Sequence, residues 1–119
     1  MAQLHLALAW VAVVAAASTV VAGAILAAGR SRSYALLDKV ILVQAVAAAA
    51  AGIVGLALVA TGGTVRDLLH VVYAAVAGGT IIGTRYAVHS HDPRRAGRWI
   101  AVAGVIVLGA MIRLFMTGR

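Results

Sequence analysis

Charged and catalytic residue types are scarce in this chain of 119 residues. It contains no cysteine, no glutamate and three aspartates, and only 11% of its residues are charged. Without cysteine there is no disulfide framework, no thiolate nucleophile and no cysteine-ligated metal or iron–sulfur site. P-loop, nucleophile-elbow, paired-carboxylate and zinc-protease motifs are also missing from the sequence. We therefore do not expect an enzyme.

Polar surface is equally scarce. The chain is 64% hydrophobic with a mean hydropathy of +1.05, whereas a soluble domain is about half apolar and about a quarter charged. Its few polar residues cannot cover the surface of a small globule in water. We therefore expect the solvent of the folded chain to be largely lipid, and at this length we expect no soluble domain.

Long apolar runs define the predicted architecture. Residues 4–28 and 40–61 carry no formal charge and extend for 25 and 22 residues, against roughly 20 needed to cross a bilayer. The first run lacks a basic leader and is too long for the core of a signal peptide, so we expect a retained helix. We predict an all-α, integral membrane, up-down-up-down four-helix bundle, a single transmembrane domain over residues 1–119 with helices at about 4–28, 35–61, 65–89 and 93–116.

The predicted helix boundaries coincide with capping patterns. Thr64 and Asp67 have the spacing of a capping box after a Gly-Gly turn, and Asp92-Pro93 places an acid before a first-turn proline. Because the connections are short, consecutive helices should be antiparallel neighbours.

Basic residues outnumber acidic ones, with a net charge of +7. They fall between the apolar runs rather than on one face, so we do not expect nucleic acid as a partner. Seven lie on the side of the first and third connections and three on the opposite side, which predicts that the first side is cytoplasmic. Both termini then lie on the outer side of a bacterial cytoplasmic membrane. The seven are Arg30, Arg32, Lys39, Arg85, Arg94, Arg95 and Arg98, and the three are Arg66, Arg113 and Arg119.

Polar side chains gather at the outer ends of three predicted helices. His5 lies near the start of the first, Asp67, His70 and Tyr73 near the start of the third, and Arg113 near the end of the fourth. Ionisable groups inside a membrane are expensive and mark candidate functional sites. The alternative is that these side chains, all near helix ends, reach water or headgroups by snorkelling. We also expect Asp67 and Arg113 to form a structural pair.

Three cofactor chemistries fit this outer cluster. A b-type haem needs two imidazoles on opposing helices, and His5 and His70 lie on helices that are diagonal in such a bundle. Gly55 or Gly109 would leave room for the porphyrin, and Arg113 would meet a propionate. A quinone would use hydrogen bonds from His70, Tyr73 and Arg113. Copper would need Met1, Met111 and Met116, although methionine in such helices usually serves packing.

Two other polar features have simpler interpretations. His89, His91 and Asp92 resemble metal ligands, but the arginines that follow would repel a divalent cation, so we predict no metal site there. Gln44 is the one amide inside a predicted span, and we expect it to form a hydrogen bond between helices.

Small residues recur four apart along the predicted helices. They form seams that allow close approach, either inside the chain or between chains, and packing within the bundle is the interpretation we favour for most of them. The seams are Ala15, Thr19, Gly23 and Ala27; Ala48 and Gly52 or Ala51 and Gly55; and Gly79 and Gly83.

The stretch Asp67-Leu68-Leu69-His70-Val71-Val72-Tyr73, together with Arg113 and the following Thr117-Gly118, resembles a group of uncharacterised bacterial four-helix membrane proteins. The resemblance extends over the second to fourth helices and implies no activity. Small multidrug transporters share the length and helix number, but the glutamate they carry in the first helix is missing here.

The function we predict is that of a small accessory or stabilising subunit of a larger membrane assembly, plausibly an electron-transport complex. Its partners would be other membrane subunits or further copies of the chain, together with lipid. One alternative is a redox carrier that binds haem b or a quinone in the outer leaflet, and another is a small dimeric transporter.

Overall fold

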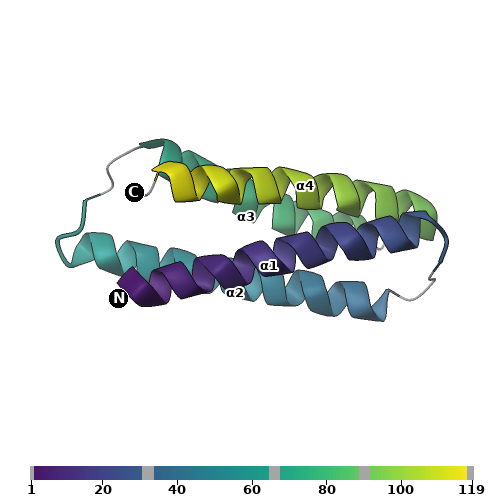
Figure 1. Cartoon of the computed structure of the whole chain (residues 1–119), viewed down its shortest axis with the longest axis horizontal. Coiled ribbons are helices and arrows are strands. Elements are labelled where there is room, and N and C mark those ends of the chain that lie inside the picture. The colour runs from purple at the N-terminus through teal and green to yellow at the C-terminus, as the bar shows by residue number, and fades with distance from the viewer. Residues whose placement is uncertain (1, 31–33, 65–67, 89–91, 118–119) are drawn as a thin grey trace.

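Four helices make up the described part of the chain. The computed structural model describes residues 2–30, 34–64, 68–88 and 92–117. Its elements are α1 (Ala2–Ala27), α2 (Ala35–Ala60), α3 (Leu68–Val88) and α4 (Pro93–Thr117). They run alternately up and down in an elongated bundle of 49 × 21 × 19 Å, with the start of α1 and the end of α4 at the same end (Figure 1). Residues 65–67 and 89 of the predicted third helix lie outside the described residues.

Each helix is long and apolar enough to cross a membrane. The bundle's long axis exceeds the bilayer's hydrocarbon core, which is about 30 Å thick. Large apolar side chains face outward on every helix, among them Val14, Leu56, Ile82 and Val105. In water such a surface would drive aggregation, whereas lipid tails solvate it. The chain thus has the features of a multi-pass membrane protein.

The helices do not pack equally against one another. α1 lies between α2 and α4, α3 contacts α4 closely and α2 only sparsely, and α1 and α3 are diagonally opposed. Lipid tails provide no hydrophobic drive for helix association, so close approach depends on van der Waals packing of small residues. The distribution of glycines therefore decides which pairs of helices are tight.

Glycines form the tight contact between α1 and α4. A Cβ atom added at Gly23 would lie 2.7 Å from the backbone nitrogen of Ala101 and 2.9 Å from the carbonyl oxygen of Gly97. One added at Gly104 would lie 2.7 Å from a methyl carbon of Val20. Gly23 belongs to the small-residue seam predicted in the first helix, and that part of the seam serves packing inside the chain. Gly97, the partner of Gly23 on α4, and Gly104, which lies against Val20, do not belong to the predicted seams.

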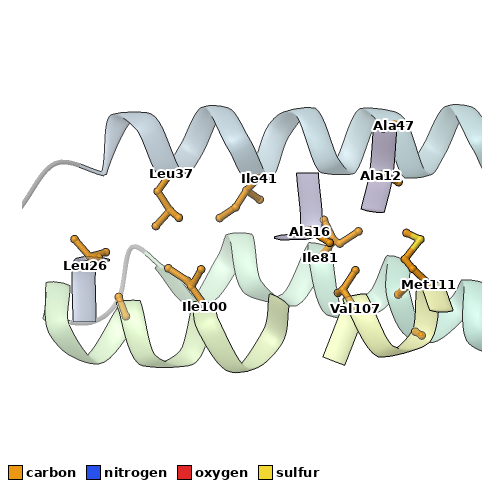
Figure 2. Close-up of a cluster of buried hydrophobic side chains, with 13 residues drawn as sticks. Ala12, Ala16, Leu26, Leu37, Ile41, Ala47, Ile81, Ile100, Val107 and Met111 are labelled. Carbon is orange, nitrogen blue, oxygen red and sulfur yellow. The ribbon is translucent and has the colours of Figure 1, made fainter. Parts of the chain in front are cut away.

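The buried core is aliphatic and contains many alanines (Figure 2). Leu37 and Ile41 of α2 point toward the other helices, and Ile100 and Val107 of α4 are nearly inaccessible. At the end with the termini, the rings of Trp10 on α1 and Phe115 on α4 lie 5.1 Å apart at their centroids. Aliphatic contacts along the bundle and this aromatic pair hold α1 and α4 in a fixed register.

The turns at the end of the bundle opposite the termini show common helix-capping patterns. Gly29 adopts a left-handed φ of +71° just after α1, and the backbone N–H of Arg30 reaches back to the carbonyl of Ile25. Asp92 precedes the first helical residue, Pro93, and its carbonyl accepts the first backbone bond of α4, from Ala96 at 2.8 Å. Asp67, the acid of the predicted capping box, lies outside the described residues.

Candidate cofactor site between two histidines

His5 on α1 is held by the backbone of α2. Its Nδ1 lies 3.0 Å from the carbonyl oxygen of Ala51, and its ring is partly buried. A carbonyl oxygen only accepts hydrogen bonds, so Nδ1 must carry the proton. In the neutral ring the lone pair then lies on Nε2. This arrangement, with one ring nitrogen anchored to a carbonyl, is the usual support for a metal-binding histidine.

Gly55, one turn after Ala51 on α2, makes space for this imidazole. A Cβ atom at position 55 would lie 3.3 Å from Cε1 and 3.6 Å from Nδ1 of His5. An alanine would press on the ring from the same helix that anchors it. Ala51 and Gly55 therefore act together, because the carbonyl of one orients the ring and the absent side chain of the other admits it.

His70 approaches His5 across the bundle from α3. The ring centroids are 6.5 Å apart, and the ring planes are inclined by 44°. Nδ1 of His70 is buried and has no hydrogen-bond partner within the described residues. A buried polar atom without a partner loses about 1–3 kcal/mol of solvation, so this atom marks a place where a ligand or a further polar group would be stabilising.

The separation of the rings is compatible with a shared metal. Two imidazoles that bind one metal from opposite sides, each at about 2 Å, place their centroids roughly 6 Å apart. The ring planes in such a pair are free to rotate about the common axis, so an inclination of 44° is no obstacle. No group of three His, Cys, Asp or Glu side chains that could hold a metal occurs in the described ranges. Two histidines alone suit a metal whose other ligands come from a macrocycle, as in b-type haem.

The remaining residues of the predicted cluster are placed less centrally. Tyr73, one turn after His70, is half-buried against the core. Arg113 on α4 is exposed at the same end of the bundle, and it interacts with another group of the chain. Asp67 lies outside the described residues, so the predicted pair of Asp67 and Arg113 stays a prediction.

The three methionines considered as copper ligands do not share one environment. Met111 is buried in the core, whereas Met116 is exposed on the surface of α4. Met1 lies outside the described residues. Met111 therefore packs inside the bundle, whereas Met116 contacts the surroundings of the bundle.

The glycines predicted as packing positions fall into two groups. Gly55 faces His5, as described above. A Cβ atom added at Gly52, Gly79 or Gly83 would meet no atom of the described chain within 4 Å, and the same holds for Gly78 and Gly109. These five positions have open space beside them. The role predicted for Gly109, leaving room for a porphyrin, stays a prediction.

Gln44 forms the predicted bond between helices. Its side-chain oxygen lies 2.9 Å from the hydroxyl of Thr19 on α1, and both residues are buried. The carbonyl of Ala51, by contrast, was not found from the sequence, because a backbone acceptor carries no side-chain signature.

Comparison with protein-family models, curated proteins and solved structures finds no match for this chain.

Proposed function

We propose that the chain is a small membrane electron carrier that binds a b-type haem between His5 and His70. The single observation behind this proposal is the 6.5 Å separation of the two imidazoles across diagonally opposed helices. Two features of the surroundings support it, namely the anchored Nδ1 of His5 and the unpartnered Nδ1 of His70. Haem would supply reversible one-electron chemistry at its iron.

The chain's own residues would bind, orient and insulate this group. The bond to Ala51 fixes the tautomer and the orientation of the His5 ring and leaves Nε2 with its lone pair. His5 and His70 would hold the group through their imidazoles, and a haem held by two histidines would supply electron transfer rather than binding of a further ligand. The surrounding apolar helices keep the site at low dielectric. The sparse contact between α2 and α3 makes their interface the least costly one to adjust around a planar group.

Quinone binding is the weaker alternative for the same end of the bundle. A quinone needs donors directed at its carbonyl oxygens, whereas the described geometry directs one imidazole at a backbone carbonyl and brings the other close to it. The facing pair of rings favours a shared metal over a quinone.

Purification from haem-replete membranes tests the proposal. We expect a visible spectrum of low-spin haem with one haem per chain, and its loss in both His5→Ala and His70→Ala. His89→Ala, at the inner end of the predicted third helix, is the matched control and should bind haem normally. Circular dichroism and gel filtration check that the variants remain folded. Full haem content in His5→Ala or in His70→Ala, or no haem in the wild-type chain supplied with haem in excess, would contradict the proposal.

We further propose that the protein works inside a larger assembly, an electron-transport complex, in a bacterial cytoplasmic membrane. The observation that favours this is the outward direction of Gly52, Gly79 and Gly83, which have open space beside them. In lipid, glycines four apart are used where another helix approaches closely. α3, which carries two of them, is also the helix with the smallest buried share.

Native electrophoresis in a mild detergent tests this second proposal. The wild-type protein should migrate in an assembly much heavier than its 12.0 kDa monomer, with other membrane subunits or with copies of itself. Gly79→Leu and Gly83→Leu should release the monomer. Ala24→Leu, at an exposed position of α1, is the control and should leave the assembly intact. A wild-type monomer that retains its function would refute the subunit role.

A further inference from the structure

A polar layer crosses the half of the bundle opposite the two histidines. Thr19 of α1 and Gln44 of α2 are both 2% exposed. Together with Thr84 of α3 and Gly104 of α4 they line a small, partly enclosed cavity of about 10 Å³, so that every helix contributes to it. This cavity is separate from the cofactor site, because it uses none of the residues that contact His5 or His70.

One buried polar group of this layer has no hydrogen-bond partner among the described residues. The hydroxyl of Thr19 lies 2.9 Å from the carbonyl oxygen of Ala15 and 2.9 Å from the side-chain oxygen of Gln44, but it has one proton to donate. The nitrogen of the Gln44 amide is buried without a partner among the described residues. Both problems have the same source, which is the orientation of the amide.

Rotating the amide of Gln44 by half a turn resolves the conflict at Thr19. Amide nitrogen and oxygen are assigned from their hydrogen bonds rather than seen directly. In the rotated amide Nε2 donates to the Thr19 hydroxyl, which in turn donates to Ala15. After this rotation, Oε1 of Gln44 occupies the buried position that has no hydrogen-bond partner. The layer then contains a buried acceptor that lacks a donor.

Thr84 provides a second acceptor on the far wall of the cavity. Its hydroxyl donates to the carbonyl oxygen of Thr80 at 2.6 Å, so its single proton is already used. Only lone pairs of Thr84 remain for a ligand. Two acceptors that line one small cavity, one on α2 and one on α3, suit a ligand with two donors.

We propose that this cavity is a binding site for one structural water molecule, which donates to Gln44 and Thr84 and bridges α2 to α3. The volume of about 10 Å³ corresponds to what a single water needs, and buried waters sit where polar groups would otherwise lack partners. A metal cation is a poor fit, because hard cations take about six oxygen ligands and the cavity offers two. The water reinforces the interface that has the sparsest direct packing.

Nuclear magnetic resonance of the full chain in detergent micelles tests the site directly. The sequence has two glutamines, Gln3 and Gln44, and no asparagine, so only two side-chain amide groups contribute signals. We expect rotating-frame cross-peaks between water and both Gln44 and the Thr84 methyl, with the sign of a long-lived dipolar contact. Gln3, which is exposed, should show only the opposite sign of proton exchange. Cross-peaks from Gln44 to surrounding methyl groups but none to water would overturn the proposal.

A double-mutant cycle provides the second measurement. Gln44→Met and Thr84→Val each remove one acceptor with little change in volume. Because both act on the same water, their effects on the unfolding equilibrium should deviate from additivity by at least about threefold. Thr61→Val is the matched control, since the hydroxyl of Thr61 also donates to a carbonyl four residues earlier but lies outside the cavity. Additivity in the first pair, equal to that of Gln44→Met with Thr61→Val, would refute the bridge.

Discussion

His5 and His70 face each other at 6.5 Å between ring centroids although they sit on diagonally opposed helices and are 65 positions apart in the sequence. Side chains across a diagonal meet only where the flanking helices leave the centre open. Here α2 contributes glycine and alanine next to the imidazole of His5. The contact between the two rings therefore depends on the positions of α1 and α3 and on the small residues of α2 beside His5.

The space at Gly55 gives the first prediction. Gly55→Ala should push the imidazole of His5 by a few tenths of an ångström and lower haem affinity by roughly tenfold, because supporting contacts of a metal ligand have effects of this size. Titration of the haem-free protein with haem measures the change. Gly52→Ala, three residues earlier and next to open space, is the control and should bind haem like the wild-type chain. Equal affinities in the two variants would show that the ring is not confined at Gly55.

The contact between α1 and α4 gives the second prediction. Gly23→Ala should destabilise the bundle by about 1–3 kcal/mol, because the new methyl group would overlap the backbone of α4. Gly83→Ala places the same methyl group in open space and should be neutral or stabilising by up to about 1 kcal/mol through helix propensity. Thermal or denaturant unfolding in detergent compares the two. Equal stabilities would mean that α1 and α4 do not approach closely in the folded protein.

The orientation in the membrane gives the third prediction. The charge distribution predicts that both termini face the outside, so an impermeant reagent added to intact cells should label tags at either end. A cysteine introduced at Arg95, in the first turn of α4, should be labelled only after the membrane is opened. Since the chain has no cysteine of its own, no background labelling of the protein interferes. Labelling of position 95 from outside would reverse the proposed topology.

Arg113 gives the fourth prediction. If its guanidinium binds a carboxylate, from Asp67 or from a haem propionate, its planar pair of donors matters and Arg113→Lys should reduce haem retention severalfold. An arginine that only reaches water at a helix end would tolerate lysine. Haem content and stability of Arg113→Lys, compared with Arg98→Lys at the other end of α4, distinguish the two. Identical behaviour of both variants would assign Arg113 to snorkelling.

The candidate site was only partly accessible to sequence reasoning. Counting helices placed His5 and His70 on diagonal helices at the same end, which made a bis-histidine site conceivable. It could not give the rotation of each helix about its own axis, because α1 and α2 are apolar on all sides and carry no amphipathic stripe. The bond from His5 to Ala51 depends on that rotation.

The sequence by itself determined the number of helices and that each is long and apolar enough to cross a membrane. In lipid, an apolar run satisfies its own backbone groups when it forms a helix. Tertiary structure alone decided which glycines are buried and which face outward, and it separated Gly23, against α4, from Gly79 and Gly83, which have open space beside them. The reason is that lipid and a packed core are equally apolar, so a glycine that contacts a helix and one that contacts lipid look the same in sequence.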